Sequence, residues 1–169
     1  MQINFRKANI SDIPEIWSIL KQAIARRKAD GSNQWQDGYP NEEIIQSDIK
    51  KEASFVLTEN ENIIGYCSIL INDEPEYGSI QGEWLTNGNF VVYHRVAIAE
   101  SHLGKGLAKK MLKYIEQFAF ENKIYSIKAD TNFDNGAMLS LFEKLGYNFC
   151  GEVIIRGSAR KAFEKVLKL

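Results

Sequence analysis

Hydrophobic and polar positions follow two different periods along the chain, and the change of period marks the elements. Apolar residues three and four positions apart predict amphipathic helices, whereas short β-branched and aromatic runs predict strands. The clearest change falls in residues 90–120, where a strand-like run, Phe90–Ile98, gives way to a polar loop and then to a helix. One face of this helix is apolar and comprises Leu107, Ala108, Met111, Leu112, Ile115, Phe118 and Ala119.

The same pattern divides the rest of the chain into short elements. Strands are expected at residues 3–7, 55–59, 63–71, 125–129, 148–156 and 161–169, with the second and third, and the last two, forming hairpins. Helices are expected after the capping residues Ser11, Asn41 and Asn135, and the last of these ends at Gly146. A long connection, residues 72–89, precedes the central strand. A chain of 169 residues can build one substantial core but hardly two, so a single α/β domain spanning residues 1–169 is expected.

Gly104 and Gly106 stand between the central strand and the long helix. Glycine lets the backbone come close to a ligand, and the first N–H groups of a helix, at the positive end of its dipole, favour an anion. The Walker A pattern fails because no Lys-Ser or Lys-Thr closes the loop, and the dinucleotide pattern GxGxxG fails because Lys109 replaces its third glycine. The segment therefore predicts a phosphate cradle of another kind.

Residues 103–108, Leu-Gly-Lys-Gly-Leu-Ala, resemble the pyrophosphate loop of the GCN5-related N-acetyltransferases, the GNAT superfamily. The pattern of that loop is Arg or Gln, two residues, Gly, one residue, then Gly or Ala. Residues 130–147 are similar to a second signature of the family, in which a strand ends in Asp-Thr, an Asn opens a helix and Leu-Gly-Tyr closes it. Leu103 departs from the pattern because it has no side-chain donor, so Lys105 or His102 would supply the charge instead.

The resemblance implies a GNAT fold, a central splayed mixed β-sheet of about seven strands flanked by about four helices. It also implies acetyl-CoA as the co-substrate, wedged where the sheet splays and paired with the central strand like an added strand. The residues implied to bind it are Val96, Ala97, Ile98, Leu103, Gly104, Lys105, Gly106, Leu107, Ala108 and Asn135. For Asn135 two roles are open, a contact to the cofactor arm and a helix cap, and one side chain could serve both.

The implied reaction transfers an acetyl group from a thioester to an amine, which requires a base, an oxyanion donor and an acid. His94 is the candidate base. The segment locally resembles serotonin N-acetyltransferases, which carry histidine at the same strand position. An unperturbed imidazole pKa of about 6.5 suits a base near neutrality. Alternation along a strand would place His94 on the face of Val96 and Ile98, with Arg95 opposite. A buried, structural histidine is the alternative. The N–H of Ile98 is the candidate oxyanion donor.

The acid is open, because Phe142 stands where many family members have a tyrosine. Phe142 cannot donate a proton. The hydroxyls of Tyr39, Tyr77 and Tyr147, or a water molecule, would replace it, or efficient turnover has been lost. Tyr147 is expected to stay in the core.

Four large aromatic residues lie in loops where the family builds its acceptor site. They are Trp35, Tyr39, Tyr77 and Trp84. Either they form a pocket for an amine with an apolar body, or they pin long loops onto the fold. Arg95 and Glu83 would pair with one another or contact the substrate.

Composition narrows the functional classes. The net charge of −1, without a basic block, argues against a nucleic-acid partner. No apolar run approaches the ~20 residues of a membrane helix, and the N-terminus lacks the apolar core of a signal peptide. A cytoplasmic protein is therefore expected. Cys67 and Cys150 have no metal-ligand spacing, so no metal is expected and both are interpreted as buried residues.

Three functional hypotheses remain. The first is an N-acetyltransferase that acts on the primary amine of a small molecule. The second is a protein or peptide N-acetyltransferase, and the third is a weakly catalytic CoA-binding regulatory module, which Phe142 motivates. A homodimer is possible for any of them.

Overall fold

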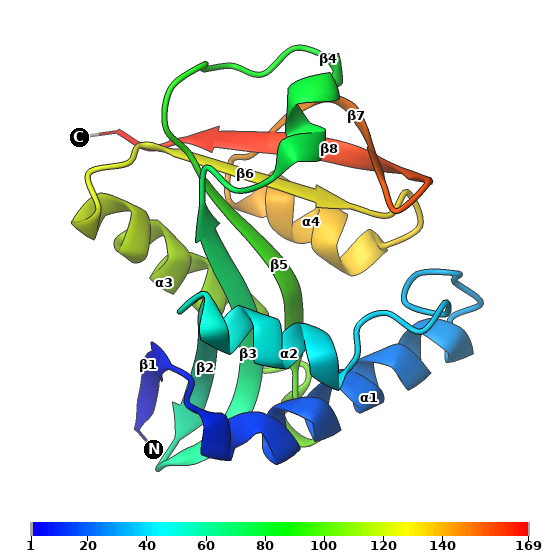
Figure 1. Cartoon of the computed structure of the whole chain (residues 1–169), viewed down its shortest axis with the longest axis vertical. Helices are drawn as coiled ribbons and strands as arrows, with labels where there is room; N and C mark the ends of the chain where they lie inside the picture. Colours follow the sequence, from blue (N-terminus) through cyan, green and yellow to red (C-terminus); the bar gives the residue numbers. More distant parts are fainter. Residues whose placement is uncertain (1, 169) are drawn as a thin grey trace. The chain divides into compact units, whose positions relative to one another are not determined.

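The strands and helices follow the predicted order, with shifts at their ends. The computed structural model describes residues 2–168. Its strands are β1 (Ile3–Lys7), β2 (Ser54–Glu59), β3 (Asn62–Ile71), β4 (Gln81–Gly82), β5 (Val91–Ile98), β6 (Ser126–Thr131), β7 (Asn148–Ile155) and β8 (Ser158–Val166) (Figure 1). Its α-helices are α1 (Ile13–Ala29), α2 (Glu42–Lys50), α3 (Leu107–Glu121) and α4 (Gly136–Lys144), and its 3-10 helices are η1 (Ile10–Asp12), η2 (Pro75–Ser79) and η3 (Glu100–His102).

The strands form a mixed sheet in the order β1-β2-β3-β5-β6-β8-β7-β4. Strands β5 and β6 are parallel and pair through Val91 with Ile127 and Val92 with Lys128, whereas the β1–β2, β2–β3, β6–β8, β7–β8 and β4–β7 pairs are antiparallel. The mixed sheet and the four α-helices confirm the expected fold class. The strand that the sequence did not reveal is β4, which has 2 residues and lies inside the long connection.

The residues that lie close together in space divide the chain into two compact units that alternate along the sequence. Unit 1 comprises the chain up to Ile69 together with His94–Tyr114, and unit 2 comprises Leu70–Tyr93 together with the chain from Ile115 onward. The boundary falls within β5, so this strand contributes residues to both units. The expectation of one domain stays a prediction.

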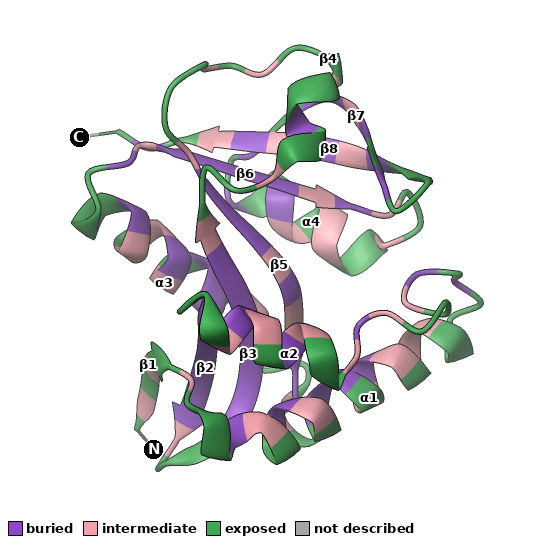
Figure 2. Ribbon diagram, in the orientation of Figure 1, coloured by how far each residue is buried: buried purple, intermediate pink, exposed green. Residues whose placement is uncertain are grey.

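In unit 1, helices α3 and α2 pack on opposite faces of β3. Strands β2 and β3 are buried along most of their length (Figure 2), as strands covered on both faces are. Gly65 faces α3, where a Cβ would lie only 2.7 Å from Cε of Met111. Tyr66, the next residue, points to the other face, and its hydroxyl donates to Asp48 of α2. Glycine at residue 65 therefore allows α3 to pack closely against β3.

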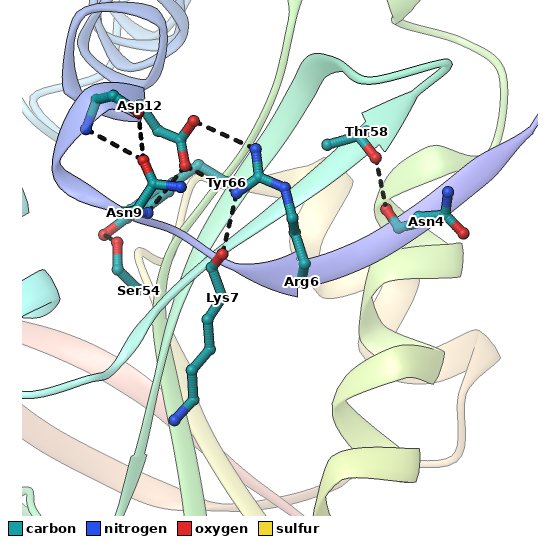
Figure 3. A network of polar contacts seen from close by, with 9 residues as sticks. Asn4, Arg6, Lys7, Asn9, Asp12, Ser54, Thr58 and Tyr66 are labelled. Atoms are coloured by element: carbon teal, nitrogen blue, oxygen red, sulfur yellow. Dashed lines mark hydrogen bonds and ion pairs between the residues drawn. The ribbon is translucent and has the colours of Figure 1, made fainter.

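The chain enters α1 through η1, and the capping residue is Asn9. The Asn9 side chain accepts a hydrogen bond from the Ser11 N–H at 3.1 Å, and the Asp12 carboxylate accepts one from the Asn9 N–H at 2.9 Å. Arg6 of β1 donates twice to the same carboxylate, at 2.8 and 3.2 Å (Figure 3). The prediction of Ser11 as the cap is wrong, because Asn9 and Asp12 form a capping box that begins the helical turn earlier.

The caps of the other two predicted helices are confirmed. The Asn41 side chain accepts a hydrogen bond from the Ile44 N–H at 2.9 Å and caps α2. After α4, Gly146 has a φ of 81°, the left-handed conformation that commonly ends a helix.

Both predicted hairpins are present, and their turns use left-handed residues. Asn60 and Glu61 join β2 to β3 with φ of 49° and 77°, and Arg156 and Gly157 join β7 to β8 with φ of 49° and 75°. Two consecutive left-handed residues match the twist of the flanking strands. The last strand was expected from residue 161 and begins at Ser158, because this turn is shorter than the sequence suggested.

In unit 2, α4 and the connection before β5 pack on opposite faces of β8. The ring of Phe163 lies against Phe142 of α4, with centroids 4.7 Å apart. Ala162 points to the other face and is buried with Tyr77 of η2 and Val153. The interior of unit 2 therefore has one layer on each side of its strands.

Glu164 of β8 fixes the long connection. It is 0% exposed, and its carboxylate accepts hydrogen bonds from the N–H groups of Leu85 at 2.7 Å and Thr86 at 3.3 Å. The hydroxyls of Thr86 and Ser126 also donate to it, at 2.5 and 2.6 Å. These bonds offset the cost of burying a carboxylate, so a segment with little regular structure is held in one conformation.

Both cysteines, Cys67 and Cys150, are buried free thiols, as predicted. Across residues 2–168, none of the helices combines the length and the apolar character that a membrane crossing requires. Within the same range, no cluster of three or more His, Cys, Asp or Glu side chains is arranged to hold a metal ion.

Candidate active site

The loop after β5 has the backbone that its glycines predicted. Gly104 and Gly106 have φ of 75° and 73°, the region that favours glycine. A Cβ at either position would meet no atom within 4 Å, and both residues are exposed. The need for glycine is therefore conformational, and the space beside the loop is open to a ligand.

Four successive main-chain N–H groups of this loop have no acceptor within the described part of the chain. Between residues 2 and 168, no acceptor is hydrogen-bonded to the N–H groups of Gly104, Lys105, Gly106 or Leu107. The side chain of Leu107 is buried and anchors the first turn of α3. Exposed N–H groups at the start of a helix form a site for an anion such as a phosphate.

Of the two predicted sources of charge, Lys105 is the better placed. The ring of His102 is already held, with Nε2 3.2 Å from Oε1 of Glu59 and Nδ1 2.8 Å from Oγ of Ser101. Lys105 is exposed between the two glycines. Its ammonium can therefore replace the side-chain donor that Leu103 lacks.

Near the end of β5, the main-chain N–H and carbonyl groups of successive residues point alternately to the two edges of the strand. The Ala99 N–H donates to the Ile64 carbonyl of β3 at 2.8 Å, and the Ala97 carbonyl oxygen also lies toward β3, 3.3 Å from the position of a Cβ at Gly65. The N–H and carbonyl of Ile98 therefore face the other side. On the side away from β3, the main-chain groups that the predicted cofactor arm would meet are therefore those of Ile98, whereas the Ala97 carbonyl faces β3.

Helix α1 reaches this side of β5 with two side chains one turn apart. Nη2 of Arg26 donates to the Ile98 carbonyl at 3.1 Å. Oε1 of Gln22 accepts a hydrogen bond from the Glu100 N–H at 2.8 Å. These contacts fix the end of β5 and the start of the glycine loop against α1.

Arg95 interrupts the extended backbone of β5. Its φ is 57°, which is uncommon for a residue other than glycine and typical of a bulge. The buried side chain forms a two-point ion pair with Asp48 of α2, with Nε 3.0 Å from Oδ2 and Nη2 2.5 Å from Oδ1. The alternation that grouped His94 with Val96 and Ile98 therefore does not carry past Arg95.

The Asp48–Arg95 pair is the centre of a buried polar network. The Tyr66 hydroxyl donates to Asp48 Oδ2 at 2.7 Å, and Ser54 Oγ donates to the Tyr66 hydroxyl at 2.7 Å. Burial and the charge of Asp48 raise the pKa of Tyr66 above its usual value, so this tyrosine remains a neutral donor. The partner of Arg95 is Asp48 and not Glu83, contrary to one interpretation of the sequence.

His94 precedes the bulge. Its side chain is half-buried, and the Nε2 atom is enclosed by the protein. The conformation of Arg95 sets the direction of the strand at this point, so the Asp48–Arg95 pair also fixes the backbone that carries the imidazole. The catalytic and the structural interpretations of His94 both stay predictions.

Trp35 and Tyr39 lie on a loop that Arg27 of α1 organises. Nη2 of Arg27 donates to Ser32 Oγ at 2.9 Å, and its Nε donates to Gln34 Oε1 at 3.1 Å. Trp35 follows with a φ of 64°, and the hydroxyl of Tyr39 accepts a hydrogen bond from the bulge guanidinium. Both rings are half-buried, and the loop that carries them is held from α1 and from β5.

In unit 2, Tyr77 and Trp84 pin the long connection. Tyr77 is 2% exposed, its hydroxyl donates to Asp130 Oδ2 at 2.6 Å, and burial raises its pKa well above the usual value. Nε1 of Trp84 donates to the Tyr77 carbonyl at 2.9 Å, and the Lys128 ammonium lies 4.5 Å from the Trp84 ring centroid. The loop-pinning interpretation is confirmed for both, and a role in an acceptor pocket stays a prediction.

The structure narrows the candidates for the acid. Phe142 is 1% exposed, within the core of unit 2. Tyr147 is also buried, as predicted, and its hydroxyl accepts a hydrogen bond from the Tyr93 hydroxyl at 3.1 Å. Tyr77 is committed to Asp130. Of the three predicted hydroxyls, that of Tyr39 is the one outside a core.

Asn135 caps α4, and its side chain accepts a hydrogen bond from the Met138 N–H at 3.2 Å. The capping role is therefore confirmed. The residue is half-buried, and its predicted contact with the cofactor arm stays a prediction.

Comparison with known proteins decides the family. Residues 17–147 match the Acetyltransferase (GNAT) family, and this range contains both the glycine loop and the helix that Asn135 caps. The chain belongs to the GNAT family. This GNAT protein is therefore an N-acetyltransferase. Its acetyl donor is acetyl-CoA, as expected from the sequence.

Three relatives illustrate the match. A GNAT-family acetyltransferase structure from Streptococcus agalactiae is 31% identical, with a TM-score of 0.91, over 99% of this chain and 96% of that one. The N-acetyltransferase YesJ of Bacillus subtilis is 24% identical over 83% of this chain and 78% of its own length. The fold is also that of YncA from Salmonella typhimurium, solved with its cofactor acetyl-CoA, at 18% identity and a TM-score of 0.71 over 100% of this chain and 96% of that one.

Two residues of this site were not predicted from the sequence. Asp48 stands between Ile45 and Ile49 on the apolar stripe of α2, and a charged residue in such a stripe indicates a buried partner. Arg26 lies in the last turn of α1, where a positive charge is already favoured by the helix dipole. No pattern in the sequence reveals its contact with Ile98, because that contact joins residues distant along the chain.

Proposed function

We propose that this GNAT protein transfers the acetyl group of acetyl-CoA to the primary amine of a small molecule, by direct attack in a ternary complex. The observation that carries the proposal is the loop 103–108, whose left-handed glycines leave N–H groups exposed at the start of α3. Family membership supports the reaction class, and the acetyl-CoA bound to YncA supports the donor.

The diphosphate of acetyl-CoA is proposed to lie on the main chain of residues 103–108, with Lys105 as the charged side chain. The pantetheine arm is proposed to pair with the main chain of Ile98 and its neighbour Val96. Asn135 is retained as a proposed contact of the arm, beside its capping role. Acetyl-CoA supplies an activated acetyl carbon, so the protein needs no nucleophile of its own.

His94 is proposed to take the proton from the attacking ammonium, because only a neutral amine has a lone pair. As nitrogen bonds to the acetyl carbon, the Ile98 N–H stabilises the negative oxygen. The hydrogen bond from Arg26 to the carbonyl of the same residue holds the backbone of Ile98 in place. The carbon–sulfur bond then breaks, the nitrogen loses its second proton to solvent to give the amide, and the thiolate takes a proton from water or from the hydroxyl of Tyr39.

The acceptor is proposed to bind against Trp35 and Tyr39, the two predicted aromatic residues on the loop after α1. Tyr77 and Trp84 shape the long connection, and their contact with an acceptor is retained as part of the proposal. An amine with an apolar body is favoured by such rings, and the ammonium form is attracted to their faces.

The test is release of CoA thiol with a panel of small amines, for wild type and His94→Ala. We expect His94→Ala to lower kcat by roughly 10²–10⁴-fold, as loss of a general base does, with the Kd for acetyl-CoA unchanged. Equal rates for the two proteins across the pH range would remove His94 from the base role. No thiol release with any amine, despite tight acetyl-CoA binding, would reject catalysis.

One observation favours a second function. Phe142 occupies the position of the usual acid, and its ring has no hydroxyl that could donate a proton. The ring packs against Tyr147 and Phe163 in the core of unit 2. A weakly catalytic CoA-binding regulatory module is the function that this feature supports. The same assay separates the two, because the module binds acetyl-CoA in about the micromolar range without turnover.

We further propose that the chain acts as one catalytic domain in the cytoplasm. The family match runs through residues of both units, which supports one domain. The free thiols Cys67 and Cys150 are typical of a reducing compartment. Sedimentation of the purified protein distinguishes a monomer from a homodimer.

A further inference from the structure

We propose that Arg26 binds a carboxylate on the acceptor, so that the amine acetylated by this enzyme carries a carboxylate group. The inference rests on the proposed function and specifies its substrate class. It is carried by the environment of one guanidinium in unit 1.

Arg26 lies where the reacting groups are proposed to meet. Its Nη2 donates to the carbonyl of Ile98 at 3.1 Å, on the side of β5 that faces away from β3. The N–H of the same residue is the proposed oxyanion donor. The adjoining turn of α1 is held as well, because Gln22 accepts a hydrogen bond from the Glu100 N–H at 2.8 Å. The guanidinium is therefore fixed beside the end of β5.

The hydrogen-bonding capacity of this guanidinium is incompletely used. Its Nη1 atom is buried and has no hydrogen-bond partner in the part of the chain that the structure describes. Arg6, Arg27 and Arg95 each form an ion pair with an aspartate, whereas the described contact of Arg26 is to a neutral carbonyl. Arginine does not lose its charge in proteins, and a buried donor without an acceptor is costly. An arriving anion would satisfy both the charge and the donor.

The acceptor is the source of this anion that best fits the position. The phosphates of acetyl-CoA are assigned to the main chain of residues 103–108, and its thioester carbonyl is neutral. A carboxylate is the anion whose geometry suits a guanidinium. Since the loop with Trp35 and Tyr39 follows α1 directly, one acceptor could place its carboxylate at Arg26 and its apolar body against these rings. The side chains that cover Nη1 shift when the ligand binds, as side chains at binding sites commonly do.

The experiment uses matched acceptors that differ only in the carboxylate. Amino acids are compared with their decarboxylated amines, for example tyrosine with tyramine and methionine with 3-(methylthio)propylamine, in the thiol-release assay. We expect wild type to prefer the carboxylate-bearing member of at least one pair by about tenfold or more in kcat/KM. Arg26→Gln should abolish that preference by raising the KM of the amino acid, with little change for the decarboxylated amine.

Three variants separate binding from structural support. Arg26→Lys keeps the charge but loses the planar, two-point geometry of the guanidinium, so it should retain part of the preference. Lys28→Gln removes a positive charge from an exposed position of the same helix and should leave the preference unchanged. Gln22→Leu removes the neighbouring contact to Glu100; it should lower the rates of both members of a pair alike and keep the preference, because the bond from Arg26 to Ile98 remains.

The proposal is overturned if wild type prefers the carboxylate in no pair, or if Arg26→Gln keeps the preference. It is also overturned if Arg26→Gln weakens the binding of acetyl-CoA as much as the binding of the amino acid. The group bound by Arg26 would then belong to the cofactor and not to the acceptor. If Gln22→Leu loses the preference as fully as Arg26→Gln does, the role of Arg26 is to support the structure of the site and not to bind the carboxylate. Failure of the proposed function is a different result, since wild type would then bind no acetyl-CoA or acetylate no amine.

Discussion

At the scale of single residues, the site depends on backbone conformations and on buried charges that support them. Gly104 and Gly106 were predicted from the sequence, because glycine is the residue that takes positive φ without strain. Arg95 was not, because nothing in the sequence indicates that an arginine takes this conformation. Its stabilisation comes from Asp48, whose partners become visible only when α2 and β5 are brought together.

Replacing Asp48 by alanine is expected to destabilise the protein strongly. The substitution leaves the buried guanidinium of Arg95 without its partner and removes the acceptor of the Tyr66 hydroxyl. Breaking a buried ion pair in this way typically costs about 3–5 kcal/mol, which urea unfolding would measure.

Arg6→Ala is the matched control, because it breaks the pair with Asp12 in which the arginine side chain is 41% exposed. Because this guanidinium is open to solvent and Asp12 keeps its hydrogen bond from the Asn9 N–H, we expect a loss closer to the about 0–1 kcal/mol of solvent-exposed pairs. Equal losses for Asp48→Ala and Arg6→Ala would show that the Asp48–Arg95 pair does not have the structural importance given to it here.

Asp12 predicts a dependence of stability on pH. The hydrogen bond from Arg6 lowers the pKa of Asp12 in the folded protein. A carboxyl with a lowered folded pKa contributes stability above its unfolded pKa, and this is lost as the pH falls through the folded value. The difference in unfolding free energy between wild type and Asp12→Asn should therefore be constant near neutrality and shrink below about pH 4. Urea titrations at several pH values measure it, and a difference that grows on acidification would contradict the assignment.

At the scale of elements, periodicity was a good guide to the centre of each strand and helix and a poor guide to its ends. Strand β1 and helix α3 were predicted because their apolar positions repeat clearly. Strand β4 was missed because two residues carry no period. The cap of α1 was misplaced because Asn9 and Asp12 begin a 3-10 turn before the helix. Alternation in β5 failed at Arg95, since a bulge leaves no mark in the hydrophobic pattern.

Packing of α3 on β3 gives a test at this scale. In Gly65→Ala the added methyl group would lie 2.7 Å from Cε of Met111 and 3.0 Å from Cδ1 of Ile98. Overpacking of this kind typically costs about 1–3 kcal/mol. We expect Gly65→Ala to lower the midpoint of urea unfolding, with Gly88→Ala as the control, because a Cβ at Gly88 meets no atom within 4 Å.

A double-mutant cycle identifies the cause. Shortening Met111 to alanine removes the closest neighbour of the new methyl group, so Gly65→Ala should cost less in the Met111→Ala background. Strictly additive losses would show that α3 does not approach β3 at this residue.

At the scale of the whole molecule, the fold and the donor were predictable, and the acceptor was not. The glycine loop and the second signature are local in sequence, so residues 103–108 and 130–147 were sufficient to suggest the GNAT family. The proposed acceptor site draws on side chains from separate segments, Arg26 of α1 and Tyr39 of the loop that follows it, and no local sequence pattern indicates which segments meet. Four aromatic residues were predicted together for the acceptor, yet Tyr77 and Trp84 are fixed in unit 2 by their own contacts.

Calorimetric titration with acetyl-CoA tests the central claim, that the main chain of residues 103–108 binds the diphosphate. The account predicts one site in wild type with a Kd in about the micromolar range. It predicts no measurable heat for Gly106→Glu, which places a carboxylate at the anion site and strains a residue whose φ is 73°, and unchanged binding for Gly88→Glu. An absence of binding to folded wild type, or equal affinity in Gly106→Glu, would contradict it.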